Sequence, residues 1–119
     1  MLMLDIKHID DEQHKILTGQ SNKNILEFAR YLSDIKKPIW IRHVLVPERS
    51  DKDEYLERLH DFIGTLDNVE RVEVLPYHTL GAYKWKELGY DYKLEGIDPP
   101  TPERIENANR ILETAKYLK

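Results

Sequence analysis

The stretch "PIWIRHVLV", residues 38–46, decides the fold class of this 119-residue chain. It is rich in β-branched and aromatic residues, and prolines stand at its start and directly after it. Such a run predicts a buried strand. Apolar residues recur at helical spacing on both sides of it, in residues 24–32 and 55–66. A strand between two amphipathic helices indicates an α/β protein.

The remaining segments extend the same alternation. They are predicted as a strand at 1–7, a helical turn at 10–17 closed by Gly19, a strand at 71–75, a long irregular segment at 86–100 and a last helix from Pro102. Ser21 or Asn22, Ser50 and Thr101 are the expected helix N-caps. The order predicts one domain with three parallel strands joined by right-handed helical crossovers.

Composition excludes several classes of protein. The net charge of −4, with 18 basic and 22 acidic residues, argues against a nucleic-acid surface. No apolar run approaches the about 20 residues that cross a membrane, so no membrane partner is expected. The chain has no cysteine, which excludes disulfides and thiolate metal ligands within it, and the cytoplasm is the expected location.

Charged side chains are predicted to meet where the strands end. Ligands of parallel α/β proteins bind at the carboxyl ends of strands. Because side chains alternate along a strand, Asp5, Lys7 and Arg42 can share one face, with His78 in the loop beyond the third strand. A guanidinium or ammonium would hold a carboxylate, and Asp5 would accept from an amine or a ribose hydroxyl. This group suits a zwitterionic small molecule.

Each of these residues also has a purely structural interpretation. Asp5 and Lys7 could form an ordinary charged strand end, Arg42 could pair with Glu73, and His78 could bond its own turn. Both interpretations stay open at this point. The other histidines lack metal-ligand spacing, and His14 and His60 are predicted to face solvent. Periodicity by itself gives no type of reaction.

The stretch "EVLPYHTLGAYKW", residues 73–85, carries an unusual density of aromatic and polar side chains beyond a strand end. With "MLDIKH" (3–8) and "WIRHVLVP" (40–47), it resembles the C-terminal half of the pyruvate formate-lyase activating enzymes. These are glycyl-radical activating members of the radical S-adenosylmethionine family. The resemblance extends over residues 1–119.

The resemblance implies half of a partial (β/α)6 barrel, with S-adenosylmethionine and a [4Fe-4S] cluster at the strand ends of the whole enzyme. In such an enzyme, reductive cleavage of S-adenosylmethionine gives a 5′-deoxyadenosyl radical. This radical removes a hydrogen atom from a glycine loop of the partner enzyme, here expected to be pyruvate formate-lyase.

Matching by position assigns cofactor contacts to seven residues. They are Asp5, Ile6, Lys7, Arg42, Val44, Leu75 and His78. The resemblance also implies a monovalent-cation site at Asp5 and the Met3 carbonyl. It assigns no catalytic side chain and no cluster ligand to these 119 residues.

The sequence departs from the family in ways that matter for activity. The family's C-x-x-x-C-x-x-C motif and its glycine-rich turn after the second strand are absent, and Glu48 replaces a usual glycine. Residues 1–119 are therefore expected to be a C-terminal half that is inactive alone. Its outer strands would be exposed edges, which favours self-association.

Two other functions stay open on the sequence. The first is a non-catalytic α/β module that binds a partner protein. The second is a half-barrel that binds a phosphorylated metabolite through Lys7 and Arg42.

Overall fold

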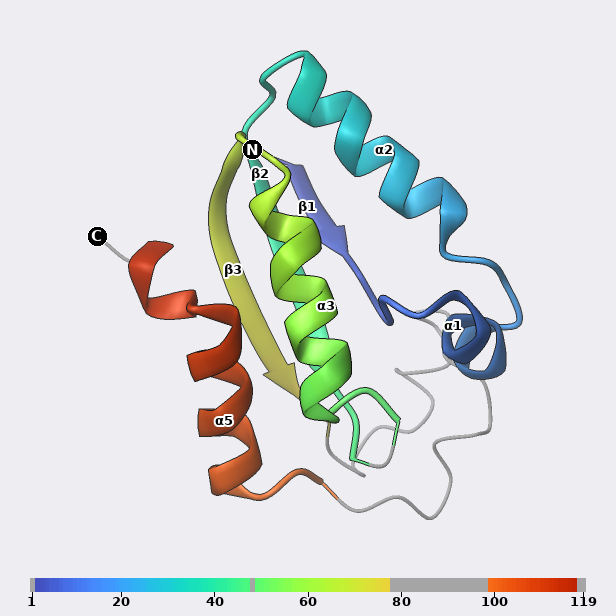
Figure 1. The fold of residues 1–119 in the computed structure, drawn as a ribbon, viewed down its shortest axis with the longest axis vertical. Helices are drawn as coiled ribbons and strands as arrows, with labels where there is room; N and C mark the ends of the chain where they lie inside the picture. Colours follow the sequence, from blue (N-terminus) through green and yellow to red (C-terminus); the bar gives the residue numbers. More distant parts are fainter. Residues whose placement is uncertain (1, 48, 78–98, 118–119) are drawn as a thin grey trace.

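Three parallel strands form a single sheet in the order β1-β2-β3 (Figure 1). The structure is a computed structural model that describes residues 2–47, 49–77 and 99–117. The strands are β1 (Leu2–Asp5), β2 (Ile39–Leu45) and β3 (Val69–Pro76). The predicted parallel order is confirmed, with β2 at the centre of the sheet.

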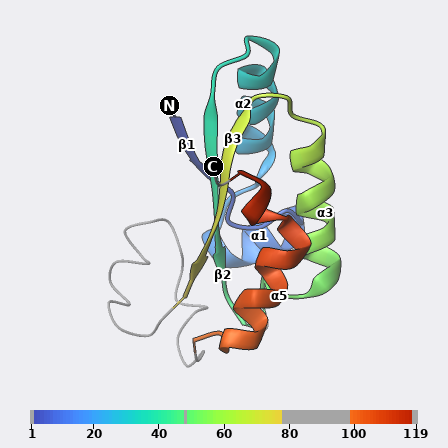
Figure 2. The ribbon, with the colours of Figure 1, turned by 90° about the vertical axis from the view of Figure 1, so that its left-hand side faces the viewer.

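The helices connect the strands and cover one face of the sheet. They are α1 (Asp11–Thr18), α2 (Lys23–Asp34), α3 (Asp53–Gly64), α5 (Pro102–Leu112) and the short 3-10 helix η2 (Thr114–Tyr117). Figure 2 shows α2, α3 and α5 on the same side of the sheet. The opposite side, which we call the open face, is left uncovered by α2, α3 and α5, and Leu17 of α1 reaches its carboxyl end beside Val44. Among those residues, none of the helices is long and apolar enough to cross a lipid bilayer.

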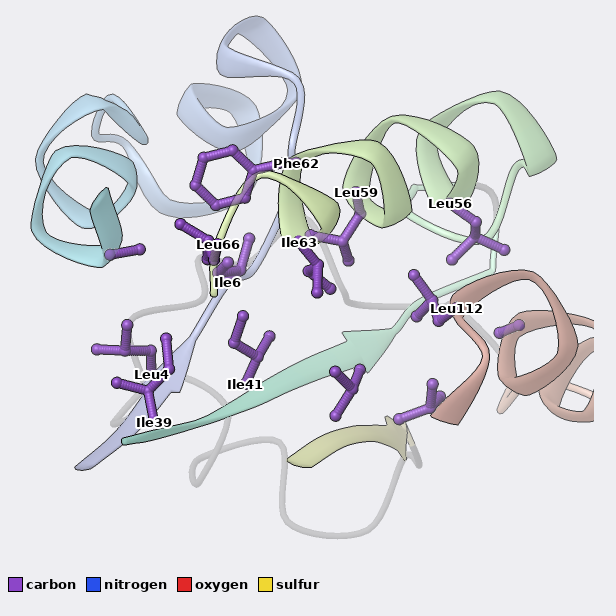
Figure 3. Close-up of a cluster of buried hydrophobic side chains, with 14 of the residues drawn as sticks. Leu4, Ile6, Ile39, Ile41, Leu56, Leu59, Phe62, Ile63, Leu66 and Leu112 are labelled. Carbon is purple, nitrogen blue, oxygen red and sulfur yellow. The ribbon is translucent and has the colours of Figure 1, made fainter. Parts of the chain in front are cut away.

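The hydrophobic core lies between the sheet and the helices (Figure 3). Ile39 and Ile41 of β2 point into the core and are fully buried. Leu56 and Leu59 of α3 are at most 1% exposed. Burying each such side chain contributes about 1.5–3 kcal/mol, so this layer is the main source of stability among the described residues. The alternation of residues along β2 therefore fixes which face the helices cover.

Several predicted helix ends are confirmed. Gly19 ends α1 in the left-handed conformation, with φ of 77°, and its N–H donates to the Lys15 carbonyl at 2.8 Å. Thr101 caps α5 by accepting from the backbone N–H of Arg104 at 3.2 Å, with Pro102 in the first turn. Asn22 occupies the N-cap position of α2, but its side-chain amide donates to the carbonyls of residues 8 and 9, and its side chain accepts no bond from the helix N–H groups.

The prediction that Ser50 caps the next helix is wrong. Lys52 occupies the N-cap position of α3, and Ser50 is only 1% exposed. Its hydroxyl donates to the Val44 carbonyl and accepts from the Val46 backbone N–H, both at 3.0 Å. The hydroxyl thus satisfies two backbone groups at the end of β2 and folds the following loop back onto the strand.

Replacing Ser50 with alanine should lower the free energy of unfolding by about 1–3 kcal/mol. The change leaves the buried Val46 N–H and Val44 carbonyl without their partner. Chemical denaturation measures the effect. Ser21→Ala is the matched control, since the Ser21 hydroxyl bonds the Asp11 carboxylate and the Lys23 N–H at exposed positions where water can replace it, and it should cost only about 0.5 kcal/mol. Equal losses in the two variants would contradict this account of Ser50.

Candidate functional site

The open face of the sheet carries its polar side chains in rows across the strands. Asp5, Arg42 and Glu73 are consecutive partners in the strand register and form one row. Met3, Trp40 and Arg71 form the row before it, nearer the amino ends of the strands. The residues between them along each strand point into the hydrophobic core.

Asp5 and Arg42 form a two-pronged ion pair. Arg42 Nε donates to Asp5 Oδ1 at 2.7 Å, and Nη2 donates to Oδ2 at 3.0 Å. The two side chains are 35% and 27% exposed, so water screens the pair only partly. Hydrogen bonding to Asp5 raises the pKa of Arg42 above its ordinary value. This geometry leaves the N–H groups of Arg42 Nη1 unused by Asp5.

The alternative pairing of Arg42 with Glu73 is not the one observed. Glu73 instead accepts from Arg71 Nη2 at 3.3 Å. The Arg71 guanidinium carbon lies 4.6 Å from the centre of the Trp40 ring, within the range of a cation–π contact. Arg71 was not singled out from the sequence, although the alternation along residues 71–75 places it on the same face as Glu73.

Apolar side chains lie at the carboxyl end of the open face. Val44 and Leu75 are register partners one row beyond Arg42. They belong to a small cluster with Leu17, Val46 and Tyr77. Val44 is only 6% exposed within this cluster, whereas Leu75 is half-buried. The site therefore places a charged row beside a small apolar cluster, a combination that suits an organic ligand with a charged end and a nonpolar body.

The other predicted site residues lie elsewhere. Ile6 is fully buried in the core, where its N–H donates to the Arg42 carbonyl at 2.9 Å and its carbonyl lies 2.7 Å from His43 Nδ1. Lys7 follows β1 and is half-buried. His78 lies outside the described residues, as do Glu48 and the loop aromatics Tyr83 and Trp85.

His8 connects the segments that follow β1 and β2. Its Nε2 donates to the Arg49 carbonyl at 2.8 Å, and its Nδ1 accepts from the Asp10 backbone N–H at 3.0 Å. The second bond requires an unprotonated Nδ1, which assigns the proton of the neutral ring to Nε2. Burial lowers the pKa of His8 from 6.5 to about 4.

The prediction that His14 faces solvent is wrong. Its side chain is buried, and Nδ1 lies 2.6 Å from the Gln20 carbonyl, because the chain turns back over α1 after Gly19. His60 is partly exposed, with its Nε2 2.7 Å from Glu113 Oε2.

The side chains of this chain suit an organic ligand but not a metal cluster. Within the described residues no three histidine or carboxylate side chains gather to hold a metal ion. The full chain has no cysteine to hold an iron–sulfur cluster, so its own residues do not fit that cofactor. The guanidinium, the carboxylate and the apolar surface do fit an amino-acid derivative such as S-adenosylmethionine.

The sequence is closely similar to known activating enzymes. No family model matches the chain. Over 117 residues, 98% of this chain, it is 58% identical to the pyruvate formate-lyase-activating enzyme of Streptococcus mutans and 56% identical to that of Listeria monocytogenes. The enzyme of Staphylococcus epidermidis is 56% identical over 112 residues. The resemblance to these enzymes is confirmed, and the chain spans 44–47% of their length.

Two solved structures share the fold. A domain of the pyruvate-formate lyase-activating enzyme from Bacteroides vulgatus aligns with a TM-score of 0.76 and 21% identity, over 98% of this chain and 62% of that one. A radical SAM methyltransferase from Sphaerobacter thermophilus aligns with a TM-score of 0.66 and 18% identity, over 93% and 30%. At these identities the likeness concerns the fold alone, and it confirms the predicted half of a partial barrel.

Stability should fall as the pH drops from 6.5 to 4. His8 resists protonation in the folded chain and accepts it readily when unfolded, so its contribution is complete above pH 6.5 and lost toward pH 4. The loss amounts to roughly 3 kcal/mol, measured by urea denaturation across this range. His8→Gln should therefore reduce the slope of stability against pH. An unchanged slope in His8→Gln would show that the buried His8 ring is not the cause of the pH dependence.

Proposed function

We propose that this chain is the S-adenosylmethionine-binding C-terminal half of a glycyl-radical activating enzyme that acts on the glycine loop of pyruvate formate-lyase. The observation that carries the proposal is the 58% identity to the Streptococcus mutans enzyme over 98% of the chain. The cofactor-binding residues matched by position include the Asp5–Arg42 pair on the open face. As a half of a barrel domain, residues 1–119 would act in the cytoplasm as part of a larger enzyme.

Different residues of the site would contact different parts of S-adenosylmethionine. Arg42 Nη1 and Lys7 would attract the carboxylate, and Asp5 would balance their charge and hold a monovalent cation or the amino group. Val44 and Leu75 would contact the nonpolar part of the nucleoside, with His78 beyond them. When bound to a reduced [4Fe-4S] cluster, this cofactor supplies the 5′-deoxyadenosyl radical, and the cluster's ligands would come from outside these 119 residues.

Two alternative functions receive less support. A site for a phosphorylated metabolite would need an excess of positive charge, but Asp5 already neutralises the Arg42 guanidinium. A non-catalytic partner-binding module has no need for the Asp5–Arg42 arrangement on an open sheet face. We therefore favour the activating-enzyme proposal.

A hybrid enzyme tests the proposal directly. Replacing the 117 matched residues of the Streptococcus mutans enzyme with this chain should preserve the formation of a glycyl radical on pyruvate formate-lyase. Electron paramagnetic resonance of the partner measures the radical. The 119-residue chain alone is the control and should produce none, because it has no cysteine for the cluster.

A folded hybrid that binds its cluster but generates no radical would overturn the proposal. So would an iron–sulfur absorbance spectrum from the 119-residue chain alone after reconstitution. An Arg42→Gln hybrid distinguishes loss of cofactor binding from loss of the fold. It should raise the KM for S-adenosylmethionine while the cluster spectrum stays the same.

The chain alone should self-associate through the outer edge of β1. Leu2 and Ile6 direct their N–H groups toward β2, so the intervening Met3 directs its own toward the free edge. Met3→Pro removes that donor without breaking a bond to β2, and it should shift the chain toward monomer. Met3→Ala is the control that keeps the N–H. Sedimentation velocity over a range of concentrations measures the oligomeric state of each variant. A monomer at all concentrations of the unmodified chain would contradict self-association.

A further inference from the structure

The row of charges on the open face continues beyond the Asp5–Arg42 pair. Glu73 follows Arg42 in the register, and Arg71 bonds Glu73 at 3.3 Å. The four side chains alternate in sign, from Asp5 through Arg42 and Glu73 to Arg71. Each of the four therefore has a neighbour of opposite charge, although Arg71 belongs to the adjacent row, and the four charges sum to zero.

Arg71 is itself held in place by an aromatic ring. Its guanidinium carbon lies 4.6 Å from the centre of the Trp40 ring, and Trp40 stands two residues before Arg42 on β2. A planar guanidinium can stack on a ring and donate to a carboxylate at the same time, which a lysine ammonium does less well. The Trp40 ring therefore fixes Arg71, and Arg71 in turn restrains Glu73.

We propose that Glu73, restrained by Arg71 on the Trp40 ring, is a positioning residue for Arg42. Asp5 binds the guanidinium through Nε and Nη2 from the β1 side, and Glu73 lies next to it on the β3 side. Two carboxylates on opposite sides keep the guanidinium centred above β2. Its Nη1 then stays available to an anionic group of a ligand.

The inference rests on the proposed function for the identity of that ligand. If the chain did not bind S-adenosylmethionine, the same charges would only pair with one another inside a barrel. The two interpretations predict different kinetics. A residue that positions Arg42 changes the affinity for S-adenosylmethionine, whereas a purely structural residue changes the fraction of enzyme that is folded.

The first test uses the hybrid enzyme. Glu73→Gln and Arg71→Met should each raise the KM for S-adenosylmethionine about fivefold or more, with kcat within about twofold. Glu70→Gln is the matched control, because Glu70 lies on the same strand, is exposed and has no register partner on β2, and it should leave both constants unchanged. A fall in kcat with an unchanged KM would overturn the inference.

A second test needs no activity and uses the 119-residue chain itself. The Nε–H of Arg42 is bonded to Asp5 at 2.7 Å and should give a slowly exchanging signal in a ¹⁵N NMR spectrum, identified by its loss in Arg42→Lys. Glu73→Gln should accelerate its exchange with water, and Glu70→Gln should not. Unchanged exchange in Glu73→Gln would show that Asp5 alone positions Arg42 and would overturn the inference, whatever the hybrid enzyme does.

Discussion

The central strand β2 lies against two different environments, because its residues alternate between a helix-covered face and an open face. Ile39, Ile41 and Leu45 are completely buried against the helices. Trp40 and Arg42 lie between them and point to the other side. A shift of one residue in the register would bury a guanidinium in the core and expose the isoleucines, so the register is strongly determined. The position of Arg42 is thus a consequence of how the core packs.

The open face then has to accommodate charges that are only partly hydrated. The Arg42 side chain is only 27% exposed, so its guanidinium loses part of its hydration, and a carboxylate in direct contact compensates for that loss. Asp5 supplies this contact from the neighbouring strand, and Glu73 and Arg71 extend the alternation of charge to the third strand. The four charges sum to zero, yet they present donor and acceptor groups on the face of the sheet that α2, α3 and α5 leave uncovered. A zwitterionic ligand matches such a surface better than an ion of a single sign.

The order of the elements could be predicted from the sequence because each strand is a short apolar run bounded by turn residues, and each helix has its own apolar stripe. Strand alternation also assigned Asp5 and Arg42 to one face. It could not decide which carboxylate pairs with Arg42, since Asp5 and Glu73 are both its register partners and only side-chain geometry separates them. Ser50 and His14 escaped prediction for a related reason. Both are buried by a chain reversal just beyond a regular element, and a local pattern contains no information on where the chain turns back.

The buried histidines indicate how the charge at this end of the sheet stays constant. His8 follows Lys7 directly, and His43 follows Arg42, so a proton on either ring would add positive charge close to the site. Burial lowers the pKa of both, to about 4 for His8, and the rings are neutral near pH 7. Each neutral ring uses its nitrogens to hold backbone: His8 joins the segments after β1 and β2, and His43 contacts the Ile6 carbonyl. Asp5, Lys7 and Arg42 therefore set the electrostatics beside the strand ends, while the histidines secure the backbone that carries them.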